Sequence, residues 1–199
     1  DVIVFDPTDL AHPVWFNPLE EVPEEYRQEF TNSFLEIFKK LFGEAWNARL
    51  EHVMRFCVLA LLEVGNATVL SIIKLLTDRD YRQSIIKKLE DQTVKNFWTN
   101  EFAAWSEKFD SEAIMPILNK VAQFVSSPMI RNIVCQIDNK MNLTDIMDWK
   151  KILLVKLSKW QLWESNANLI GAMMITRMYQ AALMRSDMLE DKRVPFSLY

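Results

Sequence analysis

Residues 151–166 read KILLVKLSKWQLWESN and combine a strand, a polar loop and the start of a helix. The run at 152–155 is apolar throughout and is bounded by lysines, which favours a strand buried on both faces. We expect this strand to extend to residue 157. Ser165 or Asn166 is then expected to cap a long helix that ends near Met184. This order of elements is typical of one βα unit in a parallel sheet.

Two further strand-like runs stand near the ends of the sequence, VIVF at 2–5 and FSLY at 196–199. Almost everything between them has helical patterns. The expected fold class is therefore mainly α, with an all-α helical domain carried on a few parallel β-strands of an α/β sheet. We divide the chain into a strand and connector at 1–22, the all-α domain at 23–135, and a return to the sheet at 136–199.

Within 23–135, apolar residues recur at spacings of three and four, which predicts about seven helices joined by short links. Pro23, followed by two acids, marks the start of the first of them. Residues 56–62 are apolar on all sides, so the helix expected at 44–63 should lie at the centre of the bundle. Other expected helix starts are Asp91 or Gln92, for one helix that continues through Trp105, then Ser111, and Thr144-Asp145.

The composition excludes several kinds of site. Half of the residues are apolar and the net charge is -4, which gives no reason to expect non-specific nucleic-acid binding. The three glycines fit no phosphate-binding loop. The two cysteines lie in apolar helical patterns. We therefore expect them to be buried free thiols in a reducing compartment. Neither histidine has a partner at metal-ligand spacing, so we expect no metal, no cofactor and no catalysis by this chain alone.

Membrane and export signals are not expected either. The sequence contains no run of about 18 apolar residues, and its first residues read as an acid and a strand rather than as a signal peptide. We therefore expect a cytoplasmic protein without membrane contact.

Five short motifs occur in a characteristic order. They are Asp6-Pro7 followed by Asn17-Pro18-Leu19, NARLE at 47–51, LLTD at 75–78, ILNKV at 117–121 with Phe124, and KILLVKLSK at 151–159. In this order and spacing they resemble the HerA/FtsK-like hexameric P-loop ATPases. The nearest branch is similar to the TraG/TraD-type coupling proteins of conjugation and type IV secretion.

The resemblance implies a middle segment of such an ATPase, between the Walker A loop and the Walker B acids. ATP and Mg²⁺ would then belong to the full-length parent, and DNA would be contacted only through its hexamer. The all-α domain would bind substrate or relaxosome proteins. Asp6, Asp9, Ser158 and Lys159 end strands, where ligands bind in open α/β sheets, and are candidates for a place near the nucleotide. Candidates for a trans-acting arginine finger are Arg49, Arg131, Arg177 and Arg185.

One loop departs from the family pattern. Trp160 and Trp163 stand where the relatives have small residues, and an exposed tryptophan pair is a candidate partner surface. This departure, the shortage of glycine and the missing Walker residues favour a second hypothesis. In it the chain is a freestanding helical interaction module, natural or engineered, without nucleotide chemistry.

Overall fold

The computed structural model describes the 199-residue chain except residues 106, 140, 159–161 and 163. Two strands, β1 (Val2–Phe5) and β2 (Ile152–Val155), stand on either side of most of the helices in the sequence. The helices and helical turns, in chain order, are η1 (Glu24–Tyr26), α1 (Arg27–Phe42), η2 (Gly43–Ala45), α2 (Ala48–Val64), α3 (Val69–Thr77), α4 (Arg79–Ile86), α5 (Gln92–Asn96), η3 (Phe97–Glu101), η4 (Phe102–Ala104), α6 (Glu107–Ser126), α7 (Pro128–Val134), α8 (Leu143–Asp148), α10 (Glu164–Met184), η5 (Arg185–Asp187) and η6 (Glu190–Lys192).

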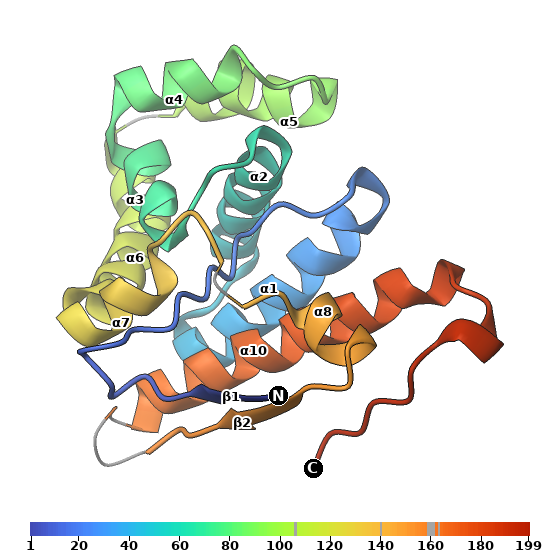
Figure 1. Cartoon of the computed structure of the whole chain (residues 1–199). Coiled ribbons are helices and arrows are strands. Elements are labelled where there is room, and N and C mark those ends of the chain that lie inside the picture. Colours follow the sequence, from blue (N-terminus) through green and yellow to red (C-terminus); the bar gives the residue numbers. More distant parts are fainter. Residues whose placement is uncertain (106, 140, 159–161, 163) are drawn as a thin grey trace.

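The two strands form a parallel pair. Val2 faces Ile152 and Phe5 faces Val155, so the strands are in register along their whole length. The pairing continues at both ends, because Ile152 donates to Asp1 at 3.0 Å and Lys156 donates to Phe5 at 2.9 Å. The mainly helical fold with parallel strands is therefore confirmed, and the helical domain lies between two strands that are neighbours in space (Figure 1).

Helix α2 is the centre of the helical domain, as its apolar second half predicts. Cys57, Val58 and Ala60 are fully buried, and so are Leu61 and Leu62. Helix α1 packs against α2 on one side and against α10 on the other. Helices α3, α4 and α6 pack against the other faces of α2 (Figure 1). The helical part and the sheet therefore share one core, with α1 and α10 as the joint between them.

A close approach joins β2 to α10. The segment after β2 lies against Gly171, where an added Cβ would meet the Leu157 side chain at 3.0 Å. A larger residue at 171 would force this side chain to move. Gly171 thus allows the strand and the helix that follows it to pack closely.

Several expected helix boundaries are wrong, each for a local reason. The helix expected at 44–63 begins at Ala48, because the Asn47 side chain accepts from the backbone N–H groups of Arg49 and Leu50 and caps it. The short helix expected to start at Thr144-Asp145 is capped instead by Asn142. The helix expected from Ser111 begins at Glu107, since no glycine or proline interrupts residues 107–110. Helix α10 begins at Glu164, so Ser165 and Asn166 lie inside it.

The single helix expected from Asp91 to Trp105 divides into α5, a π-helical turn and a 3-10 turn. Aromatic packing accounts for the change. The Phe97 ring stacks on Phe56 of α2 at 4.2 Å, and Phe102 packs on Trp98 at 4.9 Å. The tertiary contact of Phe97 with α2 overrides the regular helix here.

The strand expected at 196–199 is wrong, and β2 ends at Val155 rather than at 157. Residues 194–199 have no regular structure, and Phe196 is only partly buried against the core. Pro195 carries no N–H group for a sheet ladder, and Leu198 and Tyr199 are exposed. In the part of the chain that the structure describes, the sheet has two strands.

Among the described helices, none is both long and apolar enough to cross a membrane by itself. Helices α2 and α3 meet that test only when joined, across a bend of 112°.

Candidate functional site

The carboxyl-terminal edge of the sheet brings together Asp6, which follows β1, and Lys156, which follows β2. The Lys156 ammonium group donates to the Asp6 carboxylate at 2.6 Å. The Thr8 hydroxyl group and backbone N–H also donate to this carboxylate, at 2.6 Å and 2.9 Å. The Asp-Pro turn is therefore tied to the neighbouring strand, at the edge where ligands bind in open α/β sheets.

Lys156 and Thr8 hold the pKa of Asp6 at about 2, below its ordinary 3.8. A lowered folded-state pKa stabilises the fold above the unfolded-state value, and the gain is lost as the pH falls from about 4 to about 2. We expect Asp6→Asn to lower the free energy of unfolding at pH 7 by about 1 kcal/mol, since Lys156 is well exposed to solvent. Urea titrations at pH 7, 4, 3 and 2 should show this difference shrinking below pH 4. A difference that stays constant with pH would exclude the electrostatic origin.

The other candidates of this edge are placed differently. Asp9 accepts from the backbone N–H groups of Ala11 and His12, both at 3.0 Å, and so closes a local turn. Ser158 is half-buried, and its carbonyl accepts from Leu162. Lys159 and the two tryptophans, Trp160 and Trp163, lie outside the described residues. Of the three candidates that the structure describes, Asp6, Asp9 and Ser158, it is Asp6 that makes the most hydrogen bonds.

Two of the arginine-finger candidates are at the surface. Arg49, on α2, donates to Glu112 of α6 at 3.0 Å, and both side chains are about half exposed. Arg131 is exposed on α7. Each of these guanidinium groups can be approached from solvent.

Arg177 and Arg185, the other two, are engaged inside the protein. The Arg177 guanidinium group donates to Glu20 and to the Gln180 side chain, and it lies over the Phe30 ring. Burial lowers the pKa of Arg177, while Glu20 opposes that shift. Arg185 lies 2.8 Å from Asp148 and donates to the Val194 carbonyl at 2.6 Å. Arg177 thus holds the connector against α10, and Arg185 of η5 holds the C-terminal segment.

Asn17 links three segments that are far apart in the sequence. Its side-chain amide donates to the Ala67 carbonyl at 2.8 Å and to the Ile137 carbonyl at 3.2 Å. Its side-chain oxygen accepts from Leu19 at 3.0 Å, and its backbone N–H donates to Asn139. Asn17 is 1% exposed. The Asn-Pro-Leu motif thus marks the junction at which the connector, the α2–α3 loop and the return segment meet.

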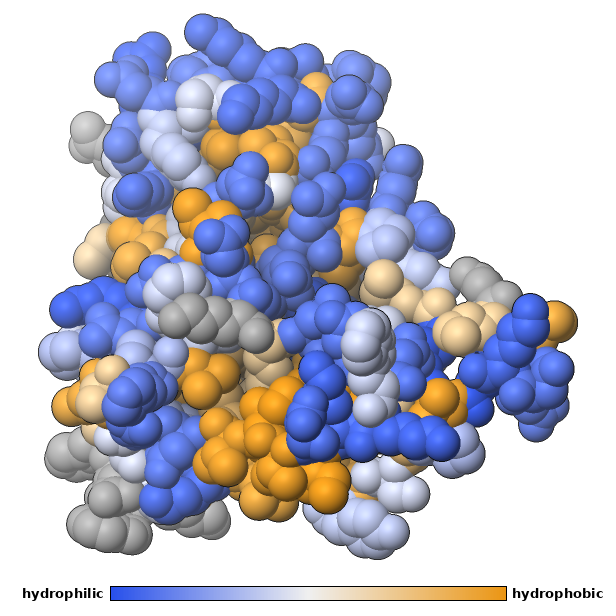
Figure 2. All heavy atoms as spheres, in the orientation of Figure 1, coloured by the Kyte–Doolittle hydropathy of each residue, from blue (hydrophilic) through white to orange (hydrophobic). Residues whose placement is uncertain are grey.

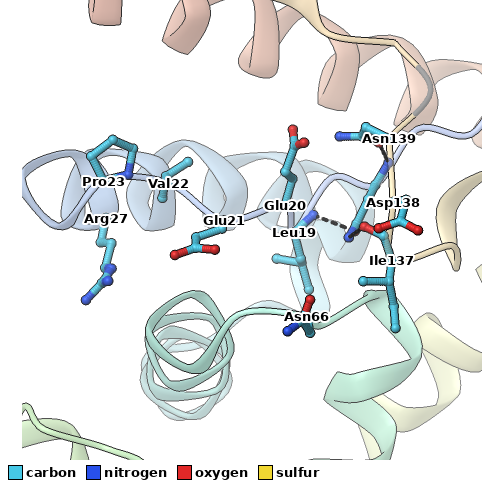
Figure 3. Close-up of a pocket in the computed structure, with 11 residues that line it drawn as sticks. Leu19, Glu20, Glu21, Val22, Pro23, Arg27, Asn66, Ile137, Asp138 and Asn139 are labelled. Atoms are coloured by element: carbon cyan, nitrogen blue, oxygen red, sulfur yellow. Dashed lines mark hydrogen bonds between the residues drawn. The ribbon is translucent and has the colours of Figure 1, made fainter.

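A cavity of about 580 Å³ opens beside this junction. Figure 3 shows Glu21 between the two ends of the cavity, with Arg27 toward one end and Asp138 and Asn139 toward the other. Glu21 and Asp138 are exposed, and neither forms an ion pair with another described residue. The cavity wall therefore carries negative charge toward solvent.

A second, smaller cavity of about 200 Å³ adjoins the first, and Glu20, Glu21, Val22 and Asn139 line both. Arg177 and Gln180 of α10 form its inner wall. We call the two cavities together the junction groove. Sequence reasoning missed it, because its walls come from the connector, α10 and the segment around 138, which only the fold brings together.

The two cysteines and the potential metal ligands were also candidates for a site. Burial raises the pKa of the Cys57 thiol far above its usual value and that of Cys135 to about 11. Both thiols are free and remain protonated at neutral pH. Within the described ranges, no three histidine, cysteine or acidic side chains gather to hold a metal ion.

Comparison with protein-family models, with curated proteins and with solved structures found no match to this chain.

Proposed function

We propose that this chain is a segment of a hexameric ATPase that moves DNA or couples substrates to type IV secretion. In this proposal the strands belong to the ATPase sheet, and the helical domain is an insertion that recognises substrate or relaxosome proteins. ATP and Mg²⁺ would be held by other parts of the parent protein. The chain alone would hydrolyse no nucleotide.

The parallel pairing of β1 and β2 across the helical domain carries this proposal. Parallel neighbours need a crossover connection, and here the whole helical domain serves as that connection. The Asp-Pro turn lies at the carboxyl-terminal edge, where the resemblance requires it. An independent interaction module has no need for two parallel strands at the two ends of its helical part.

The outer face of the strand pair gives further support. Val2 and Val4 of β1 and Ile152 and Leu154 of β2 are each more than half exposed. Figure 2 shows the apolar patch that covers this part of the molecule. Parallel sheets are normally covered on both faces, and two strands alone are marginal in water. The exposed apolar face is what a piece of a larger sheet would present.

The coding sequence on both sides of this segment tests the proposal. It predicts a GxxxxGK[ST] motif upstream of Asp1 and an Asp-Glu pair directly after Tyr199. Protein made from that longer sequence should hydrolyse ATP, and replacing the motif lysine by alanine should abolish the activity. The 199-residue chain should show no ATP-dependent rise in melting temperature.

Absence of either motif would remove the proposal and leave the freestanding interaction module. Hydrolysis that survives loss of the motif lysine would also contradict it.

A further inference from the structure

The Gln180 side-chain amide lines the junction groove, and its nitrogen is a hydrogen-bond donor without an acceptor among the described residues. Gln180 is 4% exposed. Its side-chain oxygen accepts from Arg177 at 3.2 Å, which fixes the orientation of the amide. Its nitrogen is buried and has no hydrogen-bond partner among the described residues. A buried donor without an acceptor costs free energy of folding. An oxygen atom from outside the chain would remove this cost by accepting from the Gln180 nitrogen.

The mouth of the same groove is acidic and would attract a positively charged group. Glu20 is neutralised by Arg177, whereas Glu21 and Asp138 form no ion pair with any described residue. Arg27 lies toward the opposite end from Asp138 (Figure 3). Two acids without an ion pair to a described residue, Glu21 and Asp138, stand against this one arginine in the wall of the larger cavity, so the mouth keeps a net negative charge.

Three classes of ligand can be compared with these two requirements. Nucleic acid and nucleotides are repelled by the exposed carboxylates. A bare metal ion cannot accept from Gln180. A polypeptide supplies both groups, since its backbone carbonyl is a neutral acceptor and a lysine or arginine side chain is a cation.

We propose that the junction groove binds an extended segment of a partner protein that carries a lysine or arginine. A backbone carbonyl of the segment accepts from Gln180, and the basic side chain lies between Glu21 and Asp138. The proposal rests on the part of the proposed function that gives this chain a protein partner. It places the contact at the joint between the helical domain and the strands, so a bound segment would touch both.

The test titrates the 199-residue chain with a blocked pentapeptide that has a central lysine between apolar residues. Isothermal titration calorimetry at low salt should show binding, and a peptide with glutamate in place of the lysine should not bind. The double change Glu21→Gln and Asp138→Asn should weaken binding about fivefold or more, with a smaller salt dependence. Glu190→Gln, a remote exposed acid, should leave the affinity unchanged.

Gln180→Met tests the inner wall separately. It removes the amide and keeps the size of the side chain, so peptide binding should weaken about tenfold. If this variant does not fold, amide NMR shifts of the unchanged chain serve instead, and the basic peptide should perturb Asn66, Leu143 and Thr144. The assay contains no nucleotide, so its result is separate from that of the Walker-motif test.

Three outcomes overturn the proposal. One is no binding of the lysine peptide at millimolar concentration, in which case water alone would occupy the groove. Another is equal binding of the lysine and glutamate peptides. The third is an affinity that neither Gln180→Met nor the double acid change alters.

Discussion

Replacing Asn17 with alanine will destabilise the fold by about 2–4 kcal/mol, because it leaves buried backbone groups without partners. The Ala67 and Ile137 carbonyls lose their donor, and the Leu19 N–H group loses its acceptor. In a domain of this size the melting temperature should fall by roughly 5–15 °C. Chemical denaturation monitored by circular dichroism gives the free energy directly.

Asn142→Ala is the matched control for this change. The Asn142 side-chain oxygen accepts from the Asp145 N–H group at the start of α8, and the loss of this hydrogen bond should cost about 1 kcal/mol. Asn17→Asp is a second comparison, since it keeps the acceptor for Leu19 and removes both donors. We expect it to be as harmful as alanine, because it also buries a charge. Equal costs for Asn17→Ala and Asn142→Ala would show that the junction is not a stabilising centre.

Phe5→Ala will cost about 3–5 kcal/mol, the range for a buried phenylalanine. The Phe5 side chain is fully buried, and its ring meets Phe16 edge to face at 6.1 Å. This contact attaches both β1 and the connector to the core. The measurement is again the free energy of unfolding from denaturant titration.

Val4→Ala is the control for Phe5→Ala, because the two residues are adjacent on β1 and point to opposite faces. Val4 is more than half exposed, so its truncation should cost about 0.5 kcal/mol or less. Comparable costs at the two positions would mean that the inner and outer faces of the strand are assigned incorrectly.

The sequence contained enough information for most of the element types and for part of the site. Continuous apolar runs predicted β1 and β2, and the apolar second half of α2 predicted its central position. Asp6 could be placed at a strand end because the Asp-Pro turn follows an apolar run. These features depend on the order of apolar and polar residues within a short stretch, which can be read from the sequence alone.

Contacts between distant segments were not predictable in the same way. The bonds of Asn17 involve Ala67 and Ile137, and no local pattern relates these positions. The division of the helix after α5 depends on the stack of Phe97 on Phe56. The FSLY run at 196–199 has strand-like composition, but the described chain offers it no neighbouring strand. Local sequence preference limits which secondary structures a segment can form. Contacts with residues distant in the sequence decide which of them it adopts.

The helical domain is inserted between two parallel strands that are in register. A pair of engineered cysteines tests this arrangement most directly. Val4 and Leu154 face each other on the exposed side of the pair, and neighbouring strands are about 4.8 Å apart, which suits a disulfide. The protonated native thiols of Cys57 and Cys135 should not compete.

Mild oxidation of the Val4→Cys and Leu154→Cys double variant should therefore give an intramolecular disulfide, seen by mass spectrometry after proteolysis. The shifted pair, Val2→Cys with Leu154→Cys, should stay reduced, since it is displaced by two residues along the strand, roughly 7 Å. A disulfide in the shifted pair and none in the facing pair, or none in either, would contradict the parallel register of β1 and β2.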